Sequence, residues 1–496
     1  QYPFKKPITI AVIEKQPQLW AGLPYGDRSS VNCLTITTLA EFLQDPAHLE
    51  DFTNWLSKDN HAWIAEYLEL GGSIAYAWYN RNKQVIDNGL IHTIAVPRYL
   101  YGKFKRQEFT ALISKVTASG LATVSGFTGE AASTYNDSNG DYIVAVKKDD
   151  GGIVLVCTHK LILTTGNLPF RKIEQLKGVP ANRLIQSAYQ PGIAQSLTQL
   201  TGLLKNTKNS NDRNLLMIGS NASSIEMLYL LANHKQLISL INKVVVLSPG
   251  GKLPKPIVDS SGDACFPYLD VLEKMPDCPV HLVAGALNKE FAVHFDTEVC
   301  LQTVKRLFDK LRSVLSYLPE QQYQQFLMDQ GQLFTKYIRR STTDYLQAIT
   351  QLKAQGKFEM IPAKLTTITV GHDDTLTAQY KSGGQQHHHL LTFQAAIACS
   401  GFETFDECTC PLITSMIDKG LCHINSTRKG IQVSNSFEAS ANLYITGPLL
   451  AGTVNDVLHF WHLENMSRLL ELAPLLSDSL LSDLIASDKK PELLAV

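Results

Sequence analysis

Two features of the chain have the residue types and spacing of nucleotide-binding sites, and the first is a carboxylate at the end of an apolar run. Residues Ile8–Lys15 read Ile-Thr-Ile-Ala-Val-Ile-Glu-Lys, so the run closes on Glu14. At the tip of the second strand of a dinucleotide-binding unit, such a carboxylate accepts hydrogen bonds from two ribose hydroxyls. Taken alone this is a weak signal, and an ordinary buried strand is the simpler interpretation.

The second feature is a turn led by glycine in the middle of the chain. An apolar strand (214–218) is followed by Gly219-Ser-Asn-Ala-Ser-Ser224, a helical run from 225 to about 234 and a second strand (243–247). This βαβ unit has about the length that one nucleotide-binding half requires, and its helix N-terminus would face a phosphate. Asn221 and Ser224 replace two of three expected glycines, so a βαβ unit without a ligand remains an alternative.

Other segments must position these features. The pattern predicts helices over 38–70, 103–119 and 454–472, and a helical insertion over about 296–356. It predicts strands over 121–126, 142–147, 152–163, 359–363, 366–370, 376–380 and 389–398. Asp149–Gly152 and Gly383-Gly384 are both typical of hairpin turns. The run His387–His389 follows the second turn, but no other residues nearby complete a set of metal ligands. Arg339-Arg340 could face an anionic substrate, although a solvated helix face is the simpler interpretation.

Composition sets broad bounds on the function. The 496 residues allow two to four domains, and 44% apolar and 18% charged residues are typical of a globular protein. A net charge of −1 gives no electrostatic case for nucleic acid or an anionic membrane as a partner. Nine scattered cysteines favour a reduced, cytoplasmic location, and no apolar run is long enough for a transmembrane helix.

The order of these signals along the chain resembles that of flavoproteins with two dinucleotide-binding domains. The chain is most similar to the FAD/NAD(P)-binding family that includes N-hydroxylating and urate-hydroxylating monooxygenases. The motifs that carry the similarity are Gly22–Tyr25 (Gly-Leu-Pro-Tyr), Pro97–Gly102 (Pro-Arg-Tyr-Leu-Tyr-Gly) and Gly219–Glu226. The resemblance implies an α/β fold of two Rossmann-like three-layer domains, one for FAD and one for NAD(P), with a helical insertion. It implies an FAD domain over 1–170 and 401–475, an NAD(P) domain over 171–400, and a C-terminal tail over 476–496.

The resemblance also implies binding roles for FAD. Glu14 would bind its adenosine ribose and Val124 its adenine, while Gly22, Tyr25 and Arg98 would lie along FAD toward the flavin. Gly447 and the N-terminus of the helix after Gly452 would approach the flavin, where a helix dipole stabilises negative charge.

The resemblance places NAD(P)H at the other domain. Its pyrophosphate would lie on the turn that contains Gly219, Ser220, Asn221 and Ser224. Only Ser248 or Lys252 could bind the 2′-phosphate of NADPH, so the sequence does not decide between NADH and NADPH. Gly166 and Gly401 would mark the two places where the chain crosses between the domains.

These expectations describe an FAD-dependent, NAD(P)H-using oxidoreductase, most simply a monooxygenase that hydroxylates a small molecule. A flavoprotein reductase or dehydrogenase without oxygenation is an alternative, and so is a non-catalytic nucleotide-binding or scaffold protein. No catalytic residue is identified. His459 and His462 are candidate bases, although core or capping histidines are the simpler interpretation. The oligomeric state is left open.

The beginning of the chain and three substitutions argue for weaker binding. Only seven residues precede Ile8, which leaves no room for the strand, glycine-rich turn and helix that should come first. We therefore expect a chain that starts inside its FAD domain and retains FAD poorly. Trp20, Asn221 and Pro448 also depart from the family pattern, which weakens close backbone approach to a ligand.

Overall fold

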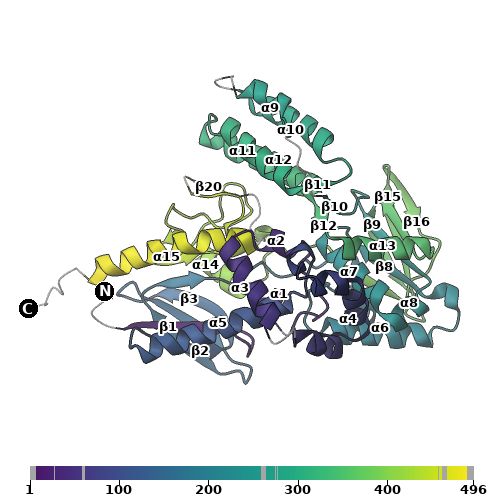
Figure 1. Ribbon diagram of the computed structural model, residues 1–496, viewed down its shortest axis with the longest axis horizontal. Coiled ribbons are helices and arrows are strands. Elements are labelled where there is room, and N and C mark those ends of the chain that lie inside the picture. Colours follow the sequence, from purple (N-terminus) through teal and green to yellow (C-terminus); the bar gives the residue numbers. More distant parts are fainter. Residues whose placement is uncertain are drawn as a thin grey trace, which may run out of the picture. The chain divides into compact units, whose positions relative to one another are not determined.

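The computed structural model describes residues 7–26, 28–58, 62–258, 264–273, 275, 278–455, 457–460 and 466–488 (Figure 1). The chain forms two compact units. Unit 1 comprises residues 1–22, 102–169 and 403–496, and unit 2 comprises residues 23–101 and 170–402. The divisions at 169/170 and 402/403 lie within two residues of the predicted boundaries after 170 and 400. Residues 23–101 group with unit 2, whereas the prediction put them in the same domain as residues 1–22. The assignment of these units to FAD and NAD(P) stays a prediction.

Three short sheets of unit 1 carry or surround the predicted site residues, apart from the β20–β21 pair described below. Strand β1 (Ile8–Glu14) runs parallel to β2 (Ala122–Thr128), with Glu14 opposite Thr128. Strand β19 (Leu443–Ile445) lies between its parallel neighbour β6 (Leu161–Leu163) and the antiparallel β18 (Glu438–Ser440). The third sheet is the antiparallel meander β3 (Glu130–Asn136), β4 (Tyr142–Lys147) and β5 (Ile153–Thr158), whose second turn is the predicted hairpin.

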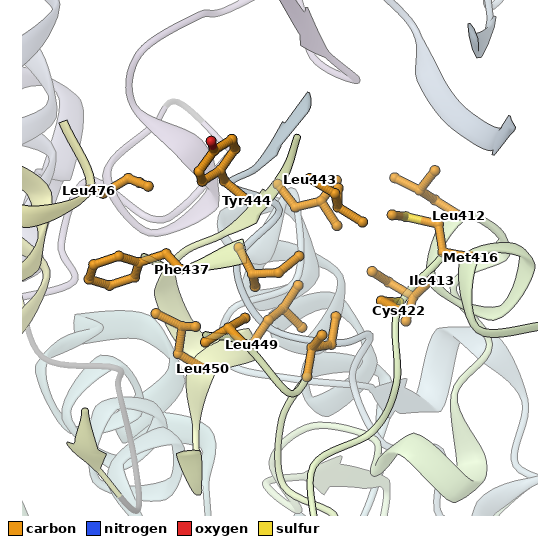
Figure 2. Packing of buried hydrophobic residues seen from close by; sticks show 14 of the residues in the cluster. Leu412, Ile413, Met416, Cys422, Phe437, Leu443, Tyr444, Leu449, Leu450 and Leu476 are labelled. Atoms are coloured by element: carbon orange, nitrogen blue, oxygen red, sulfur yellow. The ribbon is translucent and has the colours of Figure 1, made fainter. Parts of the chain in front are cut away.

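The core of unit 1 joins β19 to the helices α14 (Pro411–Asp418) and α15 (Met466–Asp488). Figure 2 shows Leu443 and Tyr444 of β19 in one cluster with Leu412 and Met416 of α14. Each large apolar side chain buried in this way contributes roughly 1.5–3 kcal/mol. This packing holds β19, and therefore the turn that follows it, in place.

Unit 2 is built on a five-stranded parallel sheet with the order β13-β9-β8-β17-β7. Its strands β9, β8 and β17 are largely apolar and almost wholly buried, as expected of a parallel sheet covered on both faces, whereas the edge strand β13 is half-buried. Their bounds are β13 (Phe358–Pro362), β9 (Lys243–Ser248), β8 (Asn214–Ile218), β17 (Ala395–Ala398) and β7 (Leu184–Ile185). Helix α7 (Ala222–Asn233) connects β8 to β9 through the short α8 (Lys235–Leu240) and packs on α13 (Thr343–Ala354). The α/β class and the parallel βαβ unit are confirmed.

The rest of unit 2 is mainly helical. Its N-terminal part holds α2 (Leu39–Phe42), α3 (Pro46–Ser57) and α4 (Trp63–Asp87), and α6 (Ile193–Asn206) precedes the sheet. A three-stranded antiparallel sheet contains β14 (Lys364–Val370), β15 (Leu376–Ser382) and β16 (Gln385–His388), with the predicted Gly383-Gly384 turn. The insertion consists of α9 (Pro267–Leu272), α10 (Val280–His294), α11 (Leu301–Leu315) and α12 (Glu320–Ile338), beside the short strands β10 (Lys255–Val258), β11 (Val299–Cys300) and β12 (Arg340–Ser341). It begins well before the predicted residue 296.

Several predicted bounds were wrong. The helix expected over 38–70 is three helices, because Asp45 accepts a hydrogen bond from the His48 N–H and so starts α3 at Pro46. The strand expected over 152–163 is split into β5 and β6, only 395–398 of the strand expected over 389–398 is β17, and β3 was missed. The helix α5 (Tyr99–Ala118) fits its prediction closely.

The helix predicted over 454–472 was the error that matters for function. In its place β20 (Thr453–Val454) and β21 (His459–Phe460) form an antiparallel pair, and α15 starts only at Met466. The Asn455 side-chain oxygen accepts hydrogen bonds from the N–H groups of Val457 and Leu458 at 2.9 and 2.7 Å. Such a local side-chain turn replaces the backbone hydrogen bonds that a helix needs.

Among the helices of the described residues, none is long and apolar enough to cross a membrane.

Candidate functional site

The glycine turn of unit 2 lies at the carboxyl end of β8, between the sheet and α7. Gly219 has a φ of 109°, and a β-carbon there would collide with the carbonyl oxygen of Cys399, directly after the neighbouring strand β17. Its N–H donates to the carbonyl oxygen of Leu247 on β9 at 2.8 Å. Only glycine satisfies both the φ and the close chain crossing, so the turn geometry requires it at this position.

The two non-glycine positions of this turn are accommodated without disruption. Ser224 is fully buried, and its hydroxyl donates to the carbonyl oxygen of Gly219 at 2.6 Å. Asn221 has extended backbone angles (φ −95°, ψ −162°) as the residue that caps α7. The Ser220 and Ser248 hydroxyls lie 2.7 Å apart, which links the turn to the end of β9. The substitutions therefore keep the shape of the turn.

The start of α7 keeps donors available for an anion. Within the part of the chain that the structure describes, the N–H groups of Ser220, Asn221 and Ala222 donate no hydrogen bond. Open N–H groups and the positive end of a helix dipole are what a phosphate needs. The turn thus fits the pyrophosphate of a dinucleotide.

Basic residues lie along the chain after β9. Lys252 is exposed. Burial and the nearby charge of Lys252 lower the pKa of Lys255. The Lys255 ammonium donates hydrogen bonds to the carbonyl oxygens of Phe295 and Tyr337. Arg340 does not lie on a solvated helix face as expected: it belongs to β12 and pairs with the buried Glu41. Lys252 is therefore the predicted basic residue that stays exposed near this turn.

Arg98, predicted to lie along FAD, has a protein partner that sequence reasoning missed. Its guanidinium makes two hydrogen bonds of 3.0 Å to the two carboxylate oxygens of Glu226 on α7. It also donates to the Pro24 carbonyl oxygen at 2.9 Å and to the Ser29 hydroxyl at 3.1 Å, and it lies over the Tyr189 ring. A fully buried acid within the otherwise uncharged α7 is the signal that could have revealed the pair, since buried charges require partners.

Burial and the facing charges act in opposite directions on the pKa values of this pair. Burial raises the pKa of Glu226, and the Arg98 guanidinium opposes that rise. Burial alone would lower the pKa of Arg98, but the facing carboxylate outweighs it and raises the pKa above the usual value. Burial and Glu226 raise the pKa of the adjacent Cys33 thiol, so this cysteine stays protonated. The pair ties the segment around Arg98 to the helix that carries the glycine turn.

In unit 1, Glu14 and Val124 lie in the two-stranded parallel sheet. Glu14 is half-buried at the end of β1, where one carboxylate oxygen accepts the Gln16 N–H at 2.9 Å. Its second oxygen accepts no hydrogen bond from the described residues, so a ribose hydroxyl has an acceptor there. Val124 is half-buried on β2 opposite Ile10. Both positions fit their predicted roles, which stay predictions.

The predicted turn residues lie at the ends of elements. Gly22 (φ 57°) begins the four-residue α1 (Gly22–Tyr25), and the division between the two units falls directly after it. The Tyr25 ring packs against Phe42 and Tyr101 with centroids 6.0 and 5.6 Å apart, and burial raises its pKa to about 12. Gly166 and Gly401 have φ values of 76° and 79°, near the divisions at 169/170 and 402/403.

Gly447 and Gly452 lie in a different setting from the one expected. Gly447 (φ 75°) starts the 3-10 helix η7 (Gly447–Leu450), and no helix begins directly after Gly452, which precedes the β20–β21 pair. A β-carbon at Gly452 would collide with the Thr427 hydroxyl, which donates to the Asn425 side chain at 2.8 Å. Close packing therefore explains why glycine is needed at position 452. The prediction that a helix N-terminus after Gly452 points its dipole toward a flavin is wrong.

The histidine side chains that the structure describes supply no further site. Among the described residues, no group of three or more His, Cys, Asp or Glu side chains could hold a metal ion. The His387 ring stacks on Tyr380 with centroids 5.4 Å apart. His462 lies outside the described residues, as does the side chain of His459.

Comparison with solved structures defines the class of fold. The chain matches DfoA bound to FAD, the cadaverine monooxygenase of desferrioxamine biosynthesis in Erwinia amylovora, with a TM-score of 0.51 and 9% identity. The match covers 95% of this chain and 88% of that one. A reduced form of the ornithine hydroxylase PvdA from Pseudomonas aeruginosa gives a TM-score of 0.49 at 11% identity over 98% and 100% of the two chains. The chain therefore has the fold of a flavoprotein with two dinucleotide-binding domains, as the sequence predicted.

Comparison of sequences finds mycobacterial relatives. An uncharacterized protein of Mycobacterium tuberculosis (strain H37Rv) is 29% identical over 483 residues, which cover 96% of this chain and 90% of the relative. An uncharacterized protein of Mycobacterium bovis matches equally well. No family model matches the chain.

Proposed function

We propose that the protein is an FAD-dependent, NAD(P)H-using oxidoreductase, and most simply a monooxygenase that hydroxylates a small molecule. The single observation that carries the proposal is the match in fold, over 95% of the chain, to a monooxygenase solved with FAD bound. The open N–H groups at the start of α7 support it, because they suit a dinucleotide phosphate.

The proposal gives the predicted residues distinct tasks. The turn from Gly219 to Ser224 holds the pyrophosphate of NAD(P)H, and Lys252 attracts a 2′-phosphate when the cofactor is NADPH. Glu14 accepts the ribose hydroxyls of FAD, and Val124 contacts the adenine. The bound cofactors supply hydride transfer and oxygen chemistry, while the chain binds and orients them and excludes water.

Flavin binding is the first test. The purified chain is titrated with FAD, and binding is followed by the flavin absorbance and the quenching of its fluorescence. Glu14→Gln is expected to weaken binding about tenfold, because a neutral amide accepts a weaker hydrogen bond from a ribose hydroxyl. Glu130→Gln is the matched control, since Glu130 pairs with Lys15 at the surface of the same unit. A chain that takes up no FAD would overturn the proposal and favour a non-catalytic scaffold.

Cofactor oxidation in air is the second test. The FAD-loaded protein is expected to oxidise NAD(P)H and, with a panel of small amines and heterocycles, to form a hydroxylated product detected by mass spectrometry. NAD(P)H oxidation that yields no hydroxylated product from any compound would support the reductase alternative. Lys252→Ala is expected to raise the KM for NADPH about tenfold and leave that for NADH unchanged, because one charged contact to the 2′-phosphate is lost. Lys205→Ala, at an exposed position of α6, is the control.

A further inference from the structure

The helical insertion of unit 2 contains a pocket of about 580 Å³ that the proposed function does not use. Its described lining residues come from β10, α9, α10, β11, the start of α11 and the loops directly before α9 and β11. A volume of this size accommodates a small organic molecule. Figure 1 shows α9 and α10 side by side, and they contact each other directly.

One wall of the pocket carries a fully buried carboxylate, Glu290 of α10. One of its oxygens accepts hydrogen bonds from the N–H groups of Tyr268 and Leu269 at 2.7 and 3.3 Å. These N–H groups belong to the first turn of α9, which starts at Pro267. The Leu269 N–H also donates to the Phe266 carbonyl oxygen at 3.0 Å, whereas the Tyr268 N–H has Glu290 as its acceptor. This oxygen therefore has a structural task.

The second carboxylate oxygen of Glu290 has no such task. It makes no hydrogen bond with the described residues. The His294 Nε2 lies 3.4 Å from it, and that nitrogen donates its hydrogen bond to the Cys265 carbonyl oxygen at 3.0 Å. A buried carboxylate oxygen without a donor costs free energy that a bound donor would recover.

The rest of the lining specifies the kind of donor. The exposed Glu298 adds a second acid, and no Lys or Arg side chain is among the described lining residues. Since these residues form no group suited to a metal ion, an organic cation fits better than an inorganic one. Val258, Pro267 and Val293 supply apolar contacts for its body.

We propose that this pocket binds a small organic molecule with a primary ammonium group on a short apolar chain. The ammonium donates to the Glu290 oxygen that accepts no hydrogen bond, and the chain lies against the apolar wall. The inference stands apart from the cofactor sites, because binding here involves neither FAD nor NAD(P)H.

The experiment compares three probes of one shape by isothermal titration calorimetry on the full chain without added cofactor. The probes are n-butylammonium, the neutral n-butanol and the anionic butyrate. The proposal expects saturable binding of n-butylammonium, with n-butanol and butyrate at least about tenfold weaker. No saturable binding of n-butylammonium would overturn it, and so would equal binding of n-butanol, which would indicate an apolar cavity alone.

Glu290→Gln separates binding from structure. The amide keeps one oxygen for the N–H groups of α9 and replaces the charged acceptor, so the fold is expected to stay intact while n-butylammonium binds about tenfold more weakly. Glu320→Gln, an exposed acid on α12 outside the pocket, controls for the loss of charge. Unchanged affinity in Glu290→Gln would contradict the proposal.

A second variant keeps the test decisive if Glu290→Gln does not fold. Val293 lines the pocket with 65% of its surface exposed, so Val293→Trp narrows the entrance without disturbing the core. It is expected to weaken n-butylammonium binding at unchanged thermal stability. Full affinity in this variant would place the binding elsewhere.

Discussion

Two strand–glycine turns of this molecule, at Gly219 and Gly447, begin alike and continue differently. Gly219 follows β8 in unit 2 and Gly447 follows β19 in unit 1, each with a positive φ at the carboxyl end of a short buried strand. After Gly219 the chain enters the twelve-residue helix α7, whereas after Gly447 it forms a 3-10 turn and the β20–β21 pair.

The difference shows that a glycine after a strand does not define what comes next. Helix α7 is buried along its length and paired to Arg98 through Glu226. The segment after Gly452 is governed by Asn455, whose side chain takes the N–H groups that would otherwise start a helix. The surroundings of each turn therefore decide whether it can offer a helix N-terminus to a phosphate.

The largest expected effect is the loss of the ion pair behind the Gly219 turn. Glu226→Gln leaves the buried Arg98 without its counter-ion and is expected to destabilise unit 2 by about 3–5 kcal/mol. Urea unfolding of the two proteins measures this. The control is Glu359→Gln, which breaks a partly exposed pair with Lys243 and is expected to cost less than about 1 kcal/mol. Equal losses in the free energy of unfolding would contradict the prediction, because the buried pair would then stabilise unit 2 no more than a partly exposed pair does.

The two glycines themselves give the next largest contrast. Gly219→Ala places a methyl group against the Cys399 carbonyl oxygen at a φ that alanine rarely adopts, and about 3 kcal/mol of stability is expected to be lost. Gly447→Ala meets only Leu469, 4.0 Å away, so its cost is expected to be the left-handed backbone alone, about 1–2 kcal/mol. Thermal unfolding measures both, and a reversed order would contradict the close crossing at Gly219.

A smaller effect is expected at the turn that replaces the predicted helix. Asn455→Ala removes the acceptor for two N–H groups and is expected to cost about 1 kcal/mol. Hydrogen exchange at the Val457 and Leu458 amides should become faster. Asn139→Ala, at an exposed position of the same unit, is the control. Unchanged exchange would mean that the side chain does not hold the β20–β21 pair in place.

The smallest effect concerns the ion pair of unit 1 between Lys160 and Asp483, 3.3 Å apart and partly exposed. The Tyr444 hydroxyl and Lys160 hold the pKa of Asp483 below its usual value. A carboxyl with a lowered pKa in the folded state stabilises above its unfolded pKa of about 4, and this is lost as the pH falls through the folded pKa. Asp483→Asn is expected to cost a few tenths of a kcal/mol at neutral pH and nothing in strong acid. A stability difference between the two proteins that grows as the pH falls would contradict this direction of the pH dependence.

Local patterns predicted a large part of the fold. The βαβ unit around Gly219 and the hairpin at Asp149–Gly152 follow from short-range rules on apolar period and turn chemistry, and the structure confirms both. The helix after Gly452 was predicted by the same rules and is wrong, because periodicity does not register a side chain that competes for backbone N–H groups. The cofactor roles of the predicted residues stay predictions.

By itself the sequence determined the α/β class, the order of the strands that carry glycine turns, and the position of Glu14 at the end of its strand. Each depends on neighbours within a few residues, whose chemistry is readable in the chain. Only the tertiary structure decided that Arg98 pairs with Glu226, 128 positions away, and that Gly219 passes against Cys399. It alone placed Glu290 over the start of α9 with one oxygen left without a hydrogen bond. Such contacts follow from how buried groups find partners in three dimensions, and sequence spacing carries no record of them.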